Sequence, residues 1–241
     1  MIDPTGRRTV TFANPIFCAV DRPDVTGAAS LARSLDGLVG GIKLGLEFVT
    51  ANGPDGVRKV AAAGLPIFLD LKFHDIPNTV AGAVRSSMDL GTAMLTLHAS
   101  GGPAMMRAAA EAAGSAEKRP WVLAVTVLTS LDGADLEATG VASDPMAQAV
   151  RLARLAAECG LDGAVCSPRE IAAIRAACGP GFKLVVPGIR PAGTAAGDQK
   201  RVMTAAEALG AGADVLVIGR PITEAADPRA AAAAIGAGIG A

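Results

Sequence analysis

The chain has 241 residues, with 22 basic and 23 acidic side chains and a net charge of −1. Because it has no excess of positive charge, it lacks the attraction that supports most nucleic-acid binding, and we expect no nucleic-acid partner. Hydrophobic residues make up 51% of the chain and charged residues only 19%, which excludes an intrinsically disordered protein.

The sequence indicates a protein that stays in the cytoplasm. Residues Met1 to Thr11 are polar, and the most apolar long run, Trp121 to Leu128, has only eight residues. A membrane-spanning helix needs about 20 apolar residues, so we expect no membrane partner.

Neither disulfide nor metal chemistry is expected. The cysteines show no C-x-x-C spacing and are predicted to be buried, reduced thiols. They are Cys18, Cys159, Cys166 and Cys178. The chain has only two histidines, which nearly excludes a histidine-rich zinc site.

Short apolar, β-branched runs recur along the chain and are predicted to be strands. They are Ile16 to Val20, Gly41 to Leu44, Ile67 to Leu71, Ala93 to Leu97, Val122 to Leu128, Gly163 to Cys166, Leu184 to Val186 and Val215 to Ile218. Alanine- and leucine-rich stretches with helical periodicity separate most of them, for example Val25 to Leu35, Met146 to Glu158 and Pro168 to Ala177.

Strands that alternate with helices pair in parallel, because a parallel neighbour is reached only by a long crossover. Eight such units without a Pro/Ser-rich linker predict an α/β fold of the (β/α)8 TIM barrel type, with a single domain over residues 1–241. A doubly wound parallel sheet is the alternative, since strand counts from one sequence are prone to error.

Unusual polar residues cluster where the predicted strands end, which is where the chemistry of such barrels lies. They are Asp21 after the first run, Lys43 in the second, Asp70 and Lys72 at the third, His98 at the fourth, Thr129 and Ser130 after the fifth, Gly188 and Arg190 after the seventh, and Gly219 and Arg220 after the eighth. The other ends of the strands carry mostly Gly, Pro or Ala. This asymmetry predicts a site at the C-terminal end of the barrel.

The segment DLKFHDIPNTV at residues 70–80 is the most informative. Asp70 and Lys72 are two residues apart, so on a strand they project to the same side and can pair. Lys43 on the neighbouring strand can approach Asp70 from the other side, and alternating charges would hold one another ionised. The alternative is a purely structural ion pair, with Asp75 shaping the turn before a helix that begins at Pro77. Spacing alone leaves both readings open.

At these residues the sequence resembles the orotidine 5'-phosphate decarboxylase family in its bacterial form. DLKFHDIPNTV is similar to that family's signature nearly letter for letter, and further matching blocks occur in the family's order. They are HASGG at 98–102, AVTVLTS at 124–130, VPGIRP at 186–191, GDQKR at 197–201 and IGRPI at 218–222. Together with Asp21 and Lys43 they cover nearly the whole chain. Ala205 stands where the family usually has proline.

The resemblance implies decarboxylation of orotidine 5'-phosphate to UMP and CO2 without a cofactor or a metal, the last step of UMP synthesis. It implies that Lys72 is the general acid that protonates C6 of the pyrimidine, with its charge held by Asp70 and Asp75. Lys43 would contact the ribose and orient Asp70, and Asp21 would bind a ribose hydroxyl.

The resemblance also implies a homodimer, in which Asp75 and Thr79 reach into the neighbouring subunit's site. Further substrate contacts are implied for the pyrimidine edge and the phosphate. They are Thr129, Ser130 and Pro187 at the pyrimidine, and Arg190, Gln199, Gly219 and Arg220 at the phosphate. For the phosphate site the residue types agree, because backbone N–H groups and a guanidinium follow the eighth strand.

Two other functions are open. A metal-dependent sugar-phosphate decarboxylase or aldolase of a related barrel shares the Asp-x-Lys-x-x-Asp spacing, but such enzymes typically have a carboxylate where this chain has Lys43. A non-catalytic nucleotide-phosphate binder is the second, although four buried charged groups would cost it stability without return. His74 and His98 are interpreted as structural.

Overall fold

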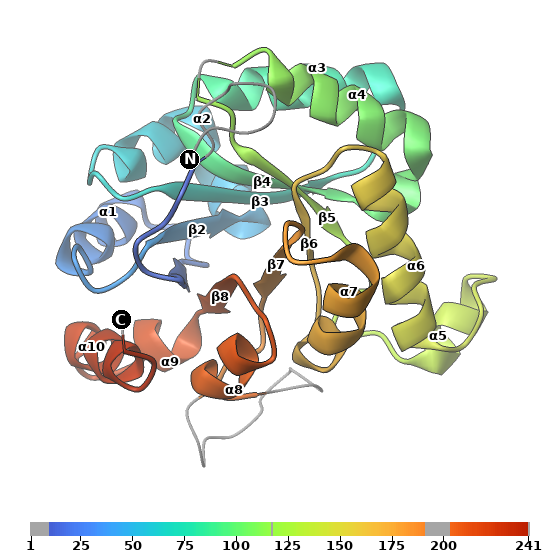
Figure 1. Cartoon of the computed structure of the whole chain (residues 1–241). Coiled ribbons are helices and arrows are strands. Elements are labelled where there is room, and N and C mark those ends of the chain that lie inside the picture. The colour runs from blue at the N-terminus through green and yellow to red at the C-terminus, as the bar shows by residue number, and fades with distance from the viewer. Residues whose placement is uncertain (1–9, 117, 191–202, 241) are drawn as a thin grey trace.

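The computed structural model describes residues 10–116, 118–190 and 203–240. In this part of the chain eight parallel strands form a closed barrel in chain order, with β1 paired to both β2 and β8. The helices surround the strands (Figure 1). The predicted (β/α)8 barrel is confirmed, and the doubly wound sheet is excluded because the sheet has no open edge.

The predicted strands agree with the observed ones except at some ends. The strands are β1 Ile16–Ala19, β2 Gly41–Gly45, β3 Ile67–Phe73, β4 Thr92–His98, β5 Trp121–Val125, β6 Gly163–Val165, β7 Lys183–Val186 and β8 Val215–Ile218. The prediction is wrong for the end of the fifth strand, which stops at Val125 and not at Leu128. Beyond it Val127 is still buried, at 5% exposure. Its apolar character therefore reflects burial in a loop and not membership of the sheet.

Side chains set where several of the crossover helices begin. The helices are α1 Val25–Ser34, α2 Leu46–Ala61, α3 Pro77–Met88, α4 Gly102–Gly114, α5 Gly133–Ala138, α6 Pro145–Glu158, α7 Ile171–Cys178, α8 Ala205–Gly210, α9 Arg220–Thr223 and α10 Pro228–Ala237. Asp24, Asp144 and Asp227 each accept two backbone N–H groups in the first turn of α1, α6 and α10. These groups have no partner within their own helix, so the caps stabilise the helix starts.

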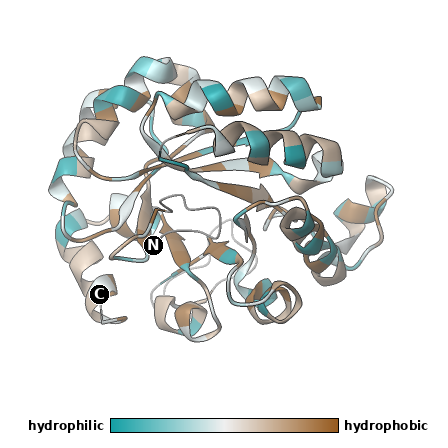
Figure 2. Ribbon diagram, turned by 45° about the horizontal axis from the view of Figure 1, so that its top comes forward, coloured by the Kyte–Doolittle hydropathy of each residue, from teal (hydrophilic) through white to brown (hydrophobic). Residues whose placement is uncertain are grey.

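Alternation along the strands divides the side chains into a barrel interior and an outer layer that packs against the helices. The interior cluster contains Phe17, Ala19, Phe68, Met94, Trp121, Leu123, Val185, Val215 and Val217. Figure 2 shows hydrophobic strands in the centre and hydrophilic residues on the outer helix surfaces. At the N-terminal end Phe12 lies edge-on to Phe17 and Trp121, with ring centroids 4.9 Å apart in both pairs. Apolar packing thus fills this end and leaves the C-terminal end for polar groups.

Two aspartates tie neighbouring strands together at the N-terminal end. Asp214 precedes β8 and accepts the Leu184 backbone N–H of β7 at 2.9 Å. Its carboxylate also binds Arg175 at 2.6 Å and Lys183 at 3.2 Å.

Asp162 has the equivalent place before β6, where it accepts the Val122 backbone N–H of β5 and pairs with Arg119. These contacts hold neighbouring strands together, so this end of the barrel contributes to stability and not to the chemistry.

All four cysteines are free thiols as predicted, and the predicted burial is confirmed for three of them. Cys18, Cys159 and Cys166 are buried, Cys178 is partly buried, and all are free thiols. Burial raises the pKa of Cys18 to about 12, so this thiol stays protonated. In the described residues no helix has the length and apolarity needed to cross a membrane.

The substitution Asp214→Ala should lower the free energy of unfolding by about 1–3 kcal/mol, because it removes the carboxylate that pairs with Arg175 and Lys183 and the acceptor of the Leu184 backbone N–H. Asp55 serves as the control, since its carboxylate is 86% exposed and pairs with the exposed Arg58. Asp55→Ala should cost about 0.5 kcal/mol or less. Urea denaturation measures both, and equal effects would contradict a structural role for Asp214.

Candidate active site

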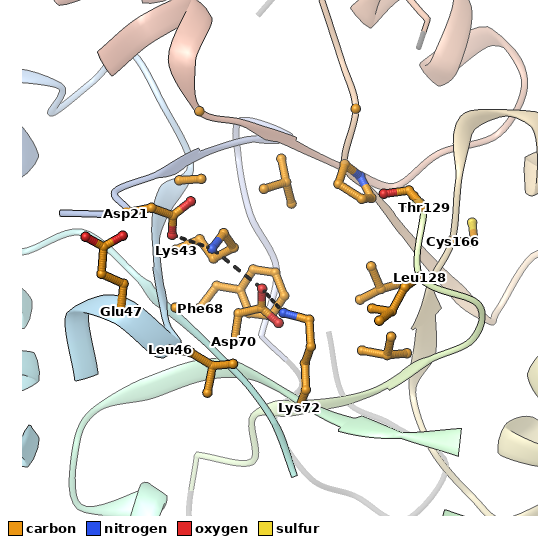
Figure 3. A pocket seen from close by; sticks show the side chains of 18 of the residues that line it. Asp21, Lys43, Leu46, Glu47, Phe68, Asp70, Lys72, Leu128, Thr129 and Cys166 are labelled. Atoms are coloured by element: carbon orange, nitrogen blue, oxygen red, sulfur yellow. Dashed lines mark hydrogen bonds and ion pairs between the residues drawn. The ribbon is translucent and has the colours of Figure 1, made fainter. Parts of the chain in front are cut away.

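A cavity of about 450 Å³ opens at the C-terminal end of the barrel. Its lining residues come from the ends of β1, β2, β3, β5, β6, β7 and β8 and from the loops that follow them. Figure 3 shows charged side chains on one side of this cavity and Leu128, Thr129 and Cys166 on the other. The cavity therefore lies where the polar strand ends predict a site.

Alternating charges form a continuous chain on the first side. Lys43 Nζ lies 3.0 Å from Asp21 Oδ1 and 3.5 Å from Asp70 Oδ2, and Lys72 Nζ lies 2.9 Å from the same Asp70 oxygen (Figure 3). Lys43 is only 8% exposed, a burial that lysine rarely reaches unless it is paired. The structure thus brings together Asp70, Lys72 and Lys43, whose approach the spacing predicts, and adds Asp21, whose pair with Lys43 was not predicted. Asp70 is shared between two ammonium groups.

The Asp70 carboxylate is held in its ionised form. Burial by itself raises the pKa of Asp70, but the ammonium groups of Lys43 and Lys72 and hydrogen bonds from Lys72 and Thr96 outweigh burial. The pKa consequently lies below its usual range. At neutral pH the cavity floor therefore carries a fixed anion between two cations.

The backbone of Lys72 is unusual. Its φ is +52°, and it is the only non-glycine residue with a positive φ in the part of the chain that the structure describes. Such a conformation costs about 1–3 kcal/mol and persists only where the surroundings impose it. Lys72 also lies in an irregular part of β3, which has three residues between its pairings Leu69 with Leu95 and Phe73 with Leu97, where β4 has one.

The predicted ion pair between Asp70 and Lys72 is therefore confirmed, but the regular strand from which it was predicted is wrong. A bulge, and not simple alternation, aims the Lys72 side chain. The expected strand end at Leu71 is likewise wrong, because β3 continues to Phe73.

Gly45 provides the space in which the first ion pair forms. It stands opposite Asp70 in the register of β2 and β3. A Cβ atom at this position would lie 3.0 Å from Asp21 Oδ1 and 3.1 Å from Lys43 Nζ. These distances are shorter than ordinary contacts, so a methyl group here would require the two charged groups to shift by a few tenths of an ångström.

The opposite wall is mostly apolar, and most of it was not predicted as part of the site. Val125, Val127, Val165 and Cys166 contribute to it, along with Pro187, which was predicted. Their signal in the sequence is weak, because apolar residues at strand ends also occur in ordinary cores. The wall creates a low-polarity space that faces the two ammonium groups.

Two guanidinium groups converge at the ends of β7 and β8. Burial, and then the positive charge of Arg220, lower the pKa of Arg190, while Glu224 partly offsets them. Both arginines line the cavity together with Gly188 and Gly219. Mutual repulsion between two cations is relieved by an anion, so this edge of the cavity suits a phosphate group.

Some predicted site residues lie outside the cavity of this single chain. Asp75 and Thr79 are exposed at the start of α3, where Asp75 accepts the Ile76 backbone N–H at 2.6 Å. Ser130 is exposed and does not line the cavity, whereas Thr129 does. Gln199 lies outside the described residues.

His74 and His98 do not line the cavity. His98 lies near the charged side chains of Lys72 and Asp70. The ring centroids of His74 and His98 are 5.5 Å apart. Burial, followed by the nearby His74 and Lys72, lowers the pKa of His98, so this ring is neutral at neutral pH. Their interpretation as structural residues stays a prediction.

Comparison with known proteins assigns the family. The model of the orotidine 5'-phosphate decarboxylase / HUMPS family matches residues 14–235. The chain belongs to this family.

Similar proteins carry consistent names. A Paramagnetospirillum magneticum orotidine 5'-phosphate decarboxylase is 56% identical over 94% of this chain and 99% of its own length. One from Anaeromyxobacter dehalogenans is 58% identical over 93% of this chain and 97% of its own length. The crystal structure of the enzyme from Lactobacillus acidophilus superposes with a TM-score of 0.83 at 35% identity, covering 95% of this chain and all of the other.

The substitution Gly45→Ala should lower kcat/KM by about tenfold or more, because the new methyl group displaces Lys43 or Asp21 and small displacements in a site are costly. Gly181→Ala is the matched control, since a Cβ there meets nothing within 4 Å and the backbone is unstrained. Steady-state kinetics of the reaction proposed below, with thermal melting to verify folding, measures the effect. Equal activity of the two variants would contradict the steric role of Gly45.

Proposed function

We propose that this protein decarboxylates orotidine 5'-phosphate to UMP and CO2 without a cofactor, as a carboxy-lyase of pyrimidine nucleotide synthesis. The observation that carries the proposal is the Asp70 carboxylate held between the Lys43 and Lys72 ammonium groups on the floor of the cavity. The names of relatives that are more than half identical over nearly the whole chain support the same substrate. We also propose that the protein acts in the cytoplasm.

Lys72 supplies the proton. When the bond between C6 and the carboxylate breaks, CO2 leaves and the bonding electron pair remains on C6 as a carbanion. A fixed ammonium next to C6 stabilises this charge as it develops and then transfers a proton to C6 to form UMP. The resulting amine regains its proton from solvent before the next turnover.

Asp70 has two roles in this mechanism. It keeps the Lys72 ammonium at one place, 2.9 Å from its own oxygen. It also lies near the substrate carboxylate, whose negative charge passes to C6 when neutral CO2 leaves. The apolar wall acts in the same direction, because a neutral CO2 molecule is better accommodated there than a carboxylate. Stabilisation of the carbanion by preorganised charge remains the principal effect.

The remaining residues bind the substrate at a distance from C6. Lys43 and Asp21 contact the ribose, while Thr129, Ser130 and Pro187 recognise the pyrimidine. The phosphate is bound by Arg190, Arg220 and Gln199 together with the backbone of Gly219. Binding energy from the phosphate is then available to hold the reacting ring in position.

The active unit is a homodimer. Asp75 and Thr79 are exposed on the single chain and serve the site of the neighbouring subunit. Ile76 lies between them and is 67% exposed, which suits a residue that becomes covered in an interface. In the dimer the Asp75 carboxylate approaches the neighbour's Lys72 ammonium and helps to hold it in position.

Magnesium-dependent chemistry on a sugar phosphate is less well supported. The family description prints a second name, HUMPS, beside orotidine 5'-phosphate decarboxylase. However, Lys43 Nζ lies between two carboxylates, where its positive charge opposes a divalent cation. The expectation of four buried charged groups is wrong for Asp75, which is exposed in the single chain. A non-catalytic binder would still gain nothing from the largely buried charges of Lys43 and Asp70, which cost desolvation energy.

Loss of orotidine 5'-phosphate absorbance in EDTA-treated protein tests the proposal. The wild type should convert the substrate to UMP, and Lys72→Ala should lower kcat by about a thousandfold or more, because it loses both the proton donor and the fixed charge. A folded wild-type protein that binds UMP without turning over the substrate would favour the binder. Activity that appears only with added Mg²⁺ would favour the metal-dependent enzyme.

Mixing two inactive variants tests the shared site. A heterodimer of Lys72→Ala and Asp75→Ala chains has one site with both defects and one intact site. Equal mixing should therefore recover about a quarter of wild-type activity. Fluorescently labelled subunits verify exchange, and exchange without recovery would contradict a site built from two chains.

A further inference from the structure

Thr96 on β4 is a polar side chain in the middle of the barrel wall. It is 0% exposed and does not line the cavity. It stands two residues after Met94, which belongs to the interior cluster, so both project into the barrel. Thr96 therefore lies behind the charged groups, where it cannot touch a substrate.

The Thr96 hydroxyl joins the two central residues of the site. It accepts the backbone N–H of Lys72 at 2.9 Å and donates to Asp70 Oδ1 at 2.9 Å. A backbone N–H can only donate and an ionised carboxylate can only accept, so the hydroxyl proton points to Asp70. One hydroxyl thus fixes a backbone on one side and a carboxylate on the other.

The hydrogen bond to Lys72 compensates for the bulge in β3. Thr96 is the single β4 residue that faces Asp70, Leu71 and Lys72 between the regular pairings. A bulge disrupts the ladder of backbone hydrogen bonds, and here a side chain accepts the N–H of Lys72. This contact supports the left-handed backbone with φ of +52° that aims the Lys72 side chain.

The hydrogen bond to Asp70 fixes the rotation of its carboxylate. Oδ2 faces both ammonium groups, at 2.9 Å from Lys72 Nζ and 3.5 Å from Lys43 Nζ, while Oδ1 accepts from Thr96. Without the hydroxyl, the plane of the carboxylate could turn about its bond to Cβ. The two ammonium groups would then follow it.

We propose that Thr96 is a positioning residue, whose hydroxyl holds the Asp70 carboxylate and the backbone of Lys72 in the one arrangement that brings the Lys72 ammonium to the reacting carbon. This inference rests on the decarboxylation proposed above. It assigns Thr96 an effect on the chemical step and little effect on substrate affinity, because the residue acts through Asp70 and Lys72.

The test compares Thr96→Val, which keeps the shape and removes the hydroxyl, with Thr96→Ser, which keeps the hydroxyl. Thr96→Val should lower kcat about 10- to 100-fold and change KM by less than about threefold, the loss expected when catalytic groups move by a fraction of an ångström to one ångström. Thr96→Ser should retain kcat within about threefold. Thr96→Ala accompanies them and takes the place of Thr96→Val if the latter does not fold.

Thr92→Val is the matched control on the same strand. Thr92 is 8% exposed and donates its hydroxyl to the Ser87 carbonyl at 3.0 Å, at the other end of β4. This variant loses a buried threonine hydroxyl without touching the site, so kcat should stay within about threefold of the wild type. Amide hydrogen exchange at Lys72, measured by NMR, should be faster in Thr96→Val than in Thr92→Val.

Several results would overturn the inference. An equal kcat for Thr96→Val and Thr92→Val would do so, as would a Thr96→Ser variant as slow as Thr96→Val, or a loss that appears in KM alone. No turnover by the wild type would overturn the proposed function and this role with it. An active wild type with an equally active Thr96→Val would overturn the role of Thr96 alone.

Discussion

The site depends on one carboxylate that serves two ammonium groups. Asp70 compensates both Lys43 and Lys72. Among the described residues it is the one carboxylate that pairs with Lys72, whereas Lys43 also pairs with Asp21. The shared carboxylate links two strands, because β2 supplies one lysine and β3 supplies the other with the aspartate. The register of the sheet is therefore also the geometry of the site. A shift of one residue between β2 and β3 would separate the charges.

The charged groups lie at one end of the barrel, and the apolar packing and the strand-joining aspartates lie toward the other end. Phe68 lies two residues before Asp70 on the same strand and belongs to the apolar interior. Below it the aromatic side chains close the N-terminal end, where Asp162 and Asp214 join neighbouring strands. The charged groups consequently rest on a packed apolar floor, which limits the access of water from below and strengthens their interactions.

The sequence predicts the regular part of this molecule and misses the irregular part. Alternation of apolar runs with helical stretches is a local pattern, so it locates the strands and the residues at their ends. The bulge at Lys72 has no local signal, because it arises from the pairing of β3 with β4. Thr96 was missed for the same reason, although a single threonine between Leu95 and Leu97 is a weak clue. Asp75 lies outside the cavity of the single chain, and the periodicity of one chain carries no signal for the role proposed for it in a neighbouring site.

The left-handed backbone of Lys72 lowers the stability of the fold at a position where the proposed activity needs a side chain. Glycine adopts this conformation without the steric cost that a side chain carries. Selection for a more stable barrel alone would therefore favour glycine at residue 72, whereas the proposed chemistry requires a lysine there. The protein thus maintains a strained residue at the centre of its site, which is a trade of stability for activity.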